Sequence, residues 1–411
     1  MYIHRTLERE LLKYLDRREI LAITGPRQSG KTTLLRHLHE GLEGAAFLDF
    51  EDRRTLELFT GDLQSFIDLH VKGNKYLFID EFQYAPDGGK SLKFIYDHHP
   101  IKMVVSGSSA SGLSIQGARH LVGRIFVFTL FPFSFEEFLG HREAPLLKLM
   151  ASGRGLSAPV VKRILPYFHE FCLYGGYPRV VLADDREEKE IVLRNIYSTY
   201  FLKEVREILR LPEDYKLSRL IHALALQAGS ILNYNELGSI SGFSHPELKR
   251  HLNILEKTFI CQQYRPFFTN KRTELAKAPK VFFMDAGFRN AVIGDFQPLG
   301  DRADKGALYE NFVASELMKG GIEPKYWRTK SKAEVDFVVE SRGSLVPIEV
   351  KSGLRRPQTT KSFQSFLGKY RPKKAIVLSE SLYADERRIL FRPIFSVAGE
   401  ICPRPARPAS G

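Results

Sequence analysis

The sequence predicts an α/β protein whose N-terminal part is a parallel sheet built around a phosphate-binding loop. The apolar run Ile20–Ile23 comes directly before Gly25–Thr32, which reads G-x-x-x-x-G-K-T, and a helical pattern of Leu34, Leu35 and Leu38 follows. Strand, loop and helix are the context that this motif requires. Further strand-like runs alternate with helical patterns, which is typical of a parallel sheet covered by helices on both faces.

The loop Gly25–Thr32 is the clearest functional signal in the chain. Its glycines let several backbone N–H groups point at one phosphate, and the positive end of the next helix faces the same anion. We expect Lys31 to reach the β- and γ-phosphates of ATP, and the Thr32 hydroxyl to bind Mg²⁺. A chance glycine-rich turn is the alternative. The predicted nucleotide-binding residues are Gly25, Pro26, Arg27, Gln28, Ser29, Gly30, Lys31, Thr32 and Thr33.

A second acidic element supports nucleotide hydrolysis. The buried strand Lys75–Ile79 ends in Asp80 and Glu81, the arrangement of a Walker B element. Asp80 would hold Mg²⁺ through its water shell, and Glu81 would orient and deprotonate the attacking water. A solvated strand end is the alternative. Upstream, residues 1–18 form an amphipathic helix and Ala45–Asp49 a second buried strand.

The next two strands carry further candidates. Ile101–Val105 leads into Ser106 and Ser108, either of which could sense the γ-phosphate; Ser108 is the catalytic candidate, with Ser106 left open. Before the fifth strand, Ile125–Leu130, Arg119 or Arg124 could reach the γ-phosphate of a neighbouring subunit. Such an arginine finger implies a homo-oligomer. A surface arginine or an intramolecular salt bridge is the alternative.

Several segments together resemble one bacterial and archaeal group of AAA-type ATPases that carry a C-terminal domain of uncharacterised role. They are Gly25–Thr32, Asp80–Gln83, Ser106–Ser109, Gly123-Arg124 and Phe131–Phe138. The resemblance covers nearly the whole chain. It implies an ASCE-type sheet, in which the sensor strand lies between the P-loop strand and the Walker B strand.

Gly176-Tyr177-Pro178-Arg179 is similar to the G-x-P element of related signalling ATPases. The similarity implies that Pro178 lines the adenine pocket. A plain turn is the alternative.

Beyond an ATPase core at 1–140, we expect a helical lid and connector at 141–212, with a single helix over Glu187–Leu209, and a winged helix at 213–290. In the third helix of the latter, Leu248, Leu252 and Leu255 would face inward. Two groups of residues, most of them basic, would face outward and could hold duplex DNA, although many winged helices bind only protein. They are Lys249, Arg250, Asn253 and Lys257 on the helix, and Lys271, Arg272 and Lys277 on the wing.

The segment 300–400 has a predicted α-β-β-β-α-β order that resembles the core of PD-(D/E)XK nucleases, the restriction-endonuclease-like fold. The matching residues are Glu310, Asp336, Glu349 and Lys351. Asp336 and Glu349, on consecutive strands, could converge on one Mg²⁺ with the help of the Val350 carbonyl oxygen, and Glu310 is a further candidate ligand. Lys351 follows Glu349 by two positions, so both face the same side, where Lys351 could activate a water. A solvated Glu–Lys pair or a degenerate, inactive domain is the alternative.

Composition sets the remaining limits. Lys and Arg outnumber Asp and Glu by 61 to 48, a net charge of +13 that favours a polyanionic partner, either nucleic acid or an anionic membrane surface. The alternative is that the charge only keeps the protein in solution. Three distant cysteines give neither a disulfide framework nor a zinc site, which fits the cytoplasm. No segment predicts a signal peptide or membrane span. The tail 401–411 is expected to be disordered.

Two functions therefore remain in competition. One is an ATPase motor or switch that licenses a metal-dependent nuclease. The other is an ATP-driven switch whose C-terminal domain recruits DNA or a partner without cutting. A phosphotransferase is less favoured, because Glu81 after Asp80 suits water activation.

Overall fold

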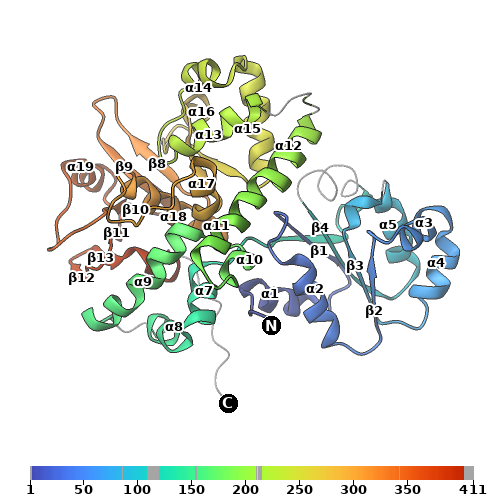
Figure 1. The fold of residues 1–411 in the computed structure, drawn as a ribbon. Helices are drawn as coiled ribbons and strands as arrows, with labels where there is room; N and C mark the ends of the chain where they lie inside the picture. Colours follow the sequence, from blue (N-terminus) through green and yellow to red (C-terminus); the bar gives the residue numbers. More distant parts are fainter. Residues whose placement is uncertain are drawn as a thin grey trace. The chain divides into compact units, whose positions relative to one another are not determined.

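The computed structural model describes residues 2–85, 87–108, 120–152, 155–209, 211, 215–341 and 343–401 (Figure 1). The chain forms two compact units. The first comprises Met1–Phe133 with Lys257–Phe259, and the second comprises Ser134–Glu256 with Ile260–Gly411.

The first unit is built on a five-stranded parallel sheet in the order β2-β3-β4-β1-β5. Because β4 lies between β1 and β3, the expected insertion of the sensor strand between the P-loop and Walker B strands is confirmed. The elements are α1 (Thr6–Tyr14), β1 (Ile20–Gly25), α2 (Lys31–Glu40), β2 (Ala45–Asp49), α3 (Arg53–Gly61), α4 (Leu63–His70), β3 (Tyr76–Asp80), η1 (Phe82–Tyr84), α5 (Gly88–His98), β4 (Lys102–Ser108) and β5 (Ile125–Thr129).

Alternating side chains of the central strands fill two separate cores. On one face, Ile20 and Ala22 of β1 pack in a cluster with apolar residues of α3, α4 and α5. On the other, Leu21 and Ile23 pack in a cluster with Leu34 of α2 and apolar residues of α1. Successive strand residues point to opposite faces, so a strand that is apolar throughout must be covered on both sides. Figure 1 shows the two helical layers around the sheet.

The second unit begins with helices. Ser134 starts α7 with a capping box: its hydroxyl accepts from the Glu137 N–H, and the Glu137 carboxylate accepts from the Ser134 N–H. The single helix expected over Glu187–Leu209 is instead interrupted by a π-helical segment, Ile196–Phe201. The elements are α7 (Phe135–Arg142), α8 (Ala144–Ala151), α9 (Ala158–Tyr174), α10 (Pro178–Val181), α11 (Arg186–Asn195), the π-helical η4 (Ile196–Phe201) and α12 (Leu202–Leu209).

Five helices and an antiparallel strand pair follow in the described part of the chain. On α15, Leu248, Leu252 and Leu255 are buried, as the periodicity predicts, and the side chains of Lys249 and Arg250 are exposed. The expected basic tip is not a bare loop, because α16 lies between β6 and β7. The elements are α13 (Tyr215–Leu226), α14 (Tyr234–Ser241), α15 (His245–Lys257), β6 (Cys261–Tyr264), α16 (Lys271–Ala276), β7 (Lys280–Phe283) and α17 (Ala286–Ile293).

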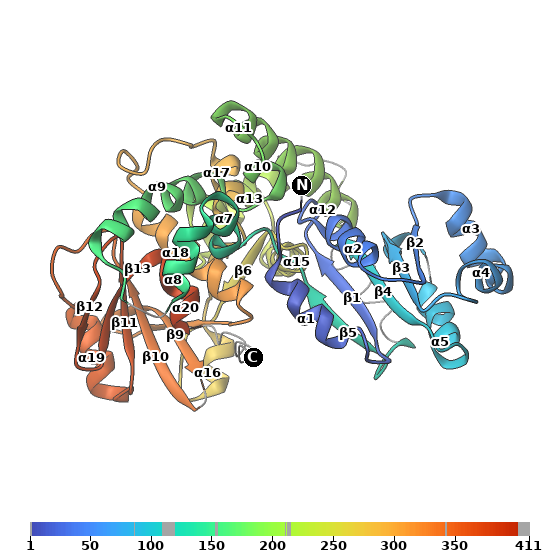
Figure 2. The ribbon, with the colours of Figure 1, turned by 90° about the horizontal axis from the view of Figure 1, so that it is seen from below.

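The C-terminal part of the second unit holds a six-stranded mixed sheet in the order β12-β13-β11-β10-β9-β8 (Figure 2). The α-β-β-β-α-β order is present. Helix α19 begins at Lys361, because the Thr360 hydroxyl caps it by accepting from the Phe363 N–H. The elements are α18 (Lys305–Lys319), β8 (Lys325–Arg328), β9 (Glu334–Ser341), β10 (Ser344–Val350), α19 (Lys361–Tyr370), β11 (Ala375–Ser379), β12 (Ala384–Glu386), β13 (Ile389–Pro393), η5 (Ile394–Ser396) and α20 (Val397–Ile401).

Two other features bear on the sequence-based expectations. Cys172 and Cys261 are buried free thiols, and Cys402 lies outside the described residues. Across the described ranges, no helix is both long and apolar enough to cross a membrane.

Candidate nucleotide site and C-terminal acidic cluster

The loop between β1 and α2 has the backbone of a phosphate-binding turn. Gly25, Gln28 and Gly30 all have positive φ angles, of 151°, 62° and 95°. A Cβ on Gly25 would lie 2.2 Å from the carbonyl oxygen of Leu130, so the close approach of the chain after β5 requires glycine there. Helix α2 then starts at Lys31, with Thr32 and Thr33 in its first turn.

The Lys31 side chain lies within the loop. It is buried, and its ammonium donates to the carbonyl oxygens of Gly25 at 3.1 Å and Pro26 at 2.9 Å. Ser29 Oγ is buried as well and has no hydrogen-bond partner among the described residues. A buried cation and an unsatisfied hydroxyl at a helix N-terminus are the donors that a phosphate group needs, so these residues fit the nucleotide.

Arg5, which the sequence did not single out, braces this loop. Its Nη1 donates to the carbonyl oxygen of Ser29 at 2.9 Å, and its Nη2 donates to that of Phe131 at 2.5 Å. The guanidinium also lies 4.5 Å from the centre of the Phe133 ring. Arg5 therefore ties the N-terminal segment to the loop and to the chain after β5.

Asp80 ends β3, and Glu81 follows it directly. In the sheet, β3 pairs with β4, and β4 pairs with the P-loop strand β1. Asp80 is buried and accepts a hydrogen bond from the Ser106 hydroxyl of β4. Of the two candidate sensor residues, Ser106 is therefore the one whose side chain has a described contact, with Asp80. The Ser108 side chain and the whole of Ser109 lie outside the described part of the structure.

Glu81 adopts a left-handed conformation, with φ 53°, directly after the strand. Burial raises the pKa of its carboxyl group, although a hydrogen bond from the Gln83 side chain opposes the shift. The charges of Asp80 and Lys31 also act on this carboxyl group, the first raising its pKa and the second lowering it. A carboxylate with a raised pKa is better suited to accept a proton near neutral pH.

Of the two candidate finger arginines, Arg119 lies outside the described residues. Arg124 makes an intramolecular salt bridge, with its Nε 2.9 Å from Asp97 Oδ1, and its guanidinium lies near the Tyr96 ring. This is the structural alternative that the sequence left open. A finger role for Arg124 would require that bridge to open.

Pro178 is the first residue of α10, in the second unit. The turn before it is held by Asp285, a buried residue that accepts from the Gly176 N–H at 2.7 Å and from the Phe288 N–H at 2.9 Å. A Cβ on Gly175 would lie 1.9 Å from Asp285 Oδ1. This carboxylate thus accounts for the turn, and contact between Pro178 and adenine stays a prediction.

The second constellation gathers on α18, β9 and β10. Asp336 Oδ2 accepts from the Val350 N–H at 2.8 Å, and Lys351 Nζ lies 3.0 Å from Glu349 Oε1. Burial, reinforced by the charge of Asp336, raises the pKa of Glu310, and burial likewise raises the pKa of Asp336. The charges of Asp336 and Glu349 also act on each other, so the structure brings these four predicted residues together.

Lys280 and Thr360 complete this cluster, and the sequence did not reveal either of them. Lys280 is buried on β7, with its Nζ 2.6 Å from Glu334 Oε1 and 3.7 Å from Glu310 Oε2. Burial alone would lower the pKa of Lys280, but the surrounding carboxylates outweigh it and raise that pKa. A sequence pattern cannot show that a lysine in an apolar strand pairs with a carboxylate on a distant helix.

The details of Glu349 decide how far this cluster resembles a metal site. Its Oε1 accepts from the Thr360 hydroxyl at 2.7 Å, while its buried Oε2 has no partner within the described ranges. Buried carboxylate oxygens normally have a hydrogen-bond partner or a cation. However, no three carboxylates of the described cluster bring ligand atoms within 4.8 Å of one another, so the side chains would have to move to share one ion.

The basic surface beside β6 and β7 is partly neutralised. Lys271 Nζ lies 3.1 Å from Glu340 Oε1 and 3.4 Å from Glu274 Oε1, whereas the side chains of Arg272 and Lys277 are exposed. Among the residues expected to meet DNA, the exposed face of α15 is therefore the stronger candidate.

Comparison with known proteins gives matches over most of the chain. Residues 17–139 match a family described as an AAA domain. Residues 165–299 and 305–394 match two further families, each described only as a domain of unknown function.

Curated relatives include an uncharacterised Haemophilus influenzae protein, 25% identical over 361 residues, which span 83% of this chain and 84% of the relative. An uncharacterised protein of Methanocaldococcus jannaschii is 26% identical over 354 residues, or 82% and 75% of the two chains.

Two solved structures are also similar. One is a Walker-type ATPase of Pyrococcus abyssi, with a TM-score of 0.45 and 16% identity over 71% of this chain and 96% of that one. The other is the Aeropyrum pernix Orc1 protein in complex with DNA, with a TM-score of 0.30 and 13% identity over 72% and 93% of the chains. The part of the chain that holds the P-loop, Asp80 and Glu81 matches the AAA domain, and it is an AAA-type P-loop ATPase domain.

Proposed function

We propose that this protein hydrolyses ATP at the P-loop and uses the nucleotide state to control a second unit that acts on nucleic acid. The observation that carries the first part is the position of Glu81. This residue follows Asp80 at the end of β3. Burial raises the pKa of its carboxyl group, and the charge of Lys31 also acts on that group. Water activation beside a phosphate requires such a base.

Each residue has a separate task in this proposal. The N–H groups of the loop and the Lys31 ammonium bind the phosphates, after Lys31 has left the carbonyl oxygens of Gly25 and Pro26. Thr32 and Asp80 hold Mg²⁺, which supplies charge neutralisation to the phosphates during transfer. Ser106 orients the Asp80 carboxylate, and Glu81 accepts the proton of the attacking water.

Steady-state phosphate release tests this assignment. Lys31→Ala should lose nucleotide binding, and Glu81→Gln should bind ATP but fall in turnover by ~10²–10⁴-fold, the usual contribution of a general base. Glu57→Gln, which alters an exposed glutamate of the same unit, is the matched control. Turnover by Glu81→Gln at the rate of the control would remove Glu81 from the chemistry.

Nucleic acid is the proposed partner of the second unit. The order α13, α14, α15, β6, α16, β7 supports a winged helix with a short helix inserted between its two strands, and the outer face of α15 carries Lys249, Arg250 and Asn253 in exposed positions. A helix with apolar residues inward and cations outward can enter the major groove. The net charge of +13 is in keeping with this.

Metal-dependent cutting is the second candidate activity, and one atom favours it. The unpartnered, buried Oε2 of Glu349 lies in a cluster with Asp336 and Lys351, where a divalent cation would satisfy it. The alternative is that the C-terminal domain only binds a partner, and that Lys280 permanently neutralises Glu310 and Glu334. Metal-dependent cleavage assays with and without ATP separate these two candidates.

A further inference from the structure

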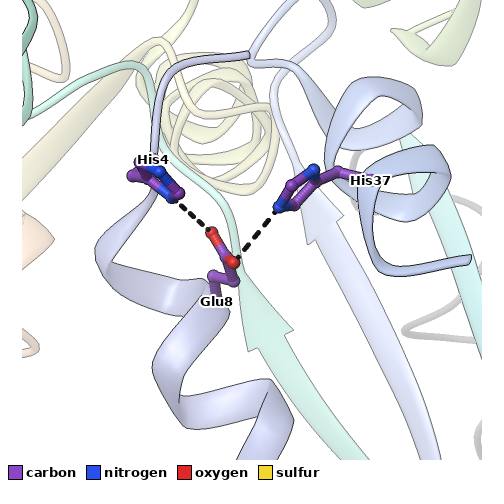
Figure 3. A group of neighbouring side chains, drawn as sticks. All are labelled: His4, Glu8 and His37. Atoms are coloured by element: carbon purple, nitrogen blue, oxygen red, sulfur yellow. Dashed lines mark ion pairs between the residues drawn. The ribbon is translucent and has the colours of Figure 1, made fainter. Parts of the chain in front are cut away.

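Three side chains near the N-terminus meet away from the nucleotide-binding residues. His4 precedes α1, Glu8 lies in the first turn of α1, and His37 lies in the last turn of α2 (Figure 3). The Nδ1 of His4 is 3.5 Å from Glu8 Oε2, and the Nε2 of His37 is 3.3 Å from Glu8 Oε1. All three ligand atoms lie within 4.8 Å of one another, and no other such group of three occurs among the described residues.

The distances suit a small tetrahedral cation. With Zn–N and Zn–O bonds of about 2.0–2.1 Å, two ligand atoms in a tetrahedral site are separated by roughly 3.3 Å. Each histidine nitrogen already lies close to this distance from one oxygen of Glu8, that of His4 from Oε2 and that of His37 from Oε1. The His4 side chain would make the remaining movement toward the cation, because it is 85% exposed and therefore free to adjust.

Tyr2 orients the group in the manner of an outer ligand shell. Its hydroxyl donates to Glu8 Oε2 at 2.9 Å, and its ring stacks on His37 with a centroid distance of 3.7 Å and an interplanar angle of 16°. Such partners fix ligand orientation and typically contribute 10–100-fold in metal affinity.

We propose that His4, Glu8 and His37 bind a zinc-type divalent cation, with water as the fourth ligand. Two imidazoles and one carboxylate with one open position are a ligand set that zinc accepts. Bound there, the cation joins the segment before α1 to the P-loop helix α2. Arg5 lies between the two N-terminal ligands and donates to the Ser29 carbonyl of the P-loop. The cation therefore fastens the segment that braces the nucleotide loop.

The experiment uses the full-length, tag-free chain, stripped of metal and free of nucleotide. Titration with Co²⁺ followed by visible absorption reports tetrahedral coordination, and Zn²⁺ should then displace Co²⁺. Wild type should bind one more equivalent of Zn²⁺ than His37→Asn, and its thermal midpoint should rise with Zn²⁺. Tyr2→Phe should weaken binding by ~10–100-fold while keeping the stoichiometry.

Two controls keep the test decisive. His98→Gln changes an exposed histidine on α5 in the same unit and should behave as wild type. His4→Asn changes a side chain that is 85% exposed, so loss of binding in that variant cannot arise from a damaged core. Equal Zn²⁺ stoichiometry and equal midpoint shifts in wild type, His4→Asn and His37→Asn would overturn the proposal. The group would then be only a set of histidine–carboxylate hydrogen bonds.

Discussion

Replacement of Arg5 by methionine tests whether the N-terminal segment supports the P-loop. Methionine keeps much of the side-chain volume but removes both hydrogen bonds, to Ser29 and Phe131, and the interaction with the Phe133 ring. Arg5 is only 7% exposed, so water cannot fully replace it. The P-loop should therefore lose both stability and nucleotide affinity.

The magnitude follows from these interactions. A hydrogen bond from a charged donor contributes roughly 1.5–3 kcal/mol, and a cation–π interaction roughly 0.5–2 kcal/mol. The apolar packing of methionine offsets part of the loss, so we expect the free energy of unfolding of the first unit to fall by about 3–5 kcal/mol. With a urea dependence of about 2 kcal/mol per molar, the midpoint should fall by about 2 M.

The chain itself offers a way to separate its two units in this assay. Its single tryptophan, Trp327, belongs to the second unit, so tryptophan fluorescence follows that unit alone. Far-UV circular dichroism follows both. Arg5→Met should move the dichroism transition and leave the fluorescence transition in place. Arg18→Met is the matched control, because Arg18 also contacts a ring and a carbonyl oxygen, on Tyr96, but is exposed. Equal shifts for the two variants would refute the reasoning.

The remaining predictions concern the second unit. Asp304→Asn should cost roughly 3–5 kcal/mol, because it leaves the buried Arg289 without its carboxylate partner. Burial opposes the shift, but bonds to arginines lower the pKa of Asp304 to about 2, so its contribution is complete above the ordinary value of 3.8. Allowing for solvent screening, about 1 kcal/mol should be lost as pH falls through 2, and calorimetry should show the difference in stability between wild type and the variant narrowing by about that amount there. Removing Lys249 and Arg250 should reduce the slope of the logarithm of the DNA-binding constant against the logarithm of the salt concentration. The slope should become shallower by about 0.9 for each phosphate that the protein no longer neutralises, as measured by fluorescence anisotropy. Asp336→Ala should abolish Mg²⁺- or Mn²⁺-dependent cleavage in a gel assay while sparing ATP hydrolysis.

Controls and contrary outcomes differ for each of these tests. Asp301→Asn, at an exposed position, should leave stability unchanged, and an equal loss in both aspartate variants would exclude the buried pair as the cause. Lys162→Gln with Arg163→Gln removes the same charge from exposed positions on α9. If that pair flattens the salt slope as much as the α15 pair, the α15 face is not the interface. If wild type cleaves neither DNA nor RNA, with or without ATP, the cluster at Asp336 belongs to a binding module.

The first unit was readable from sequence because each of its signals is local. An apolar strand followed by Gly25–Thr32, and another followed by Asp80 and Glu81, state both the element and the chemistry within a few residues. The observed strand order agrees with the resemblance, and in the second unit the buried face of α15 also follows from a local pattern.

The missed residues act over long separations. Arg5 reaches Phe131, and Lys280 on β7 reaches Glu310 on α18; neither pairing leaves a periodic trace in the sequence. The break in the helix at Ile196–Phe201 was missed for a different reason. The segment keeps a helical apolar pattern, and only the backbone hydrogen bonds distinguish a π-helical turn.

ATP hydrolysis at Glu81 is the central claim, and a single-turnover experiment measures it most directly. ATP is bound to excess protein, Mg²⁺ is added, and the conversion of bound ATP to ADP is followed by rapid quenching and chromatography. Wild type should convert its bound ATP to ADP, while Glu81→Gln should hold the same amount of nucleotide as unreacted ATP. Equal rates of ADP formation in the two proteins, with equal binding, would contradict the assignment of Glu81 as the base.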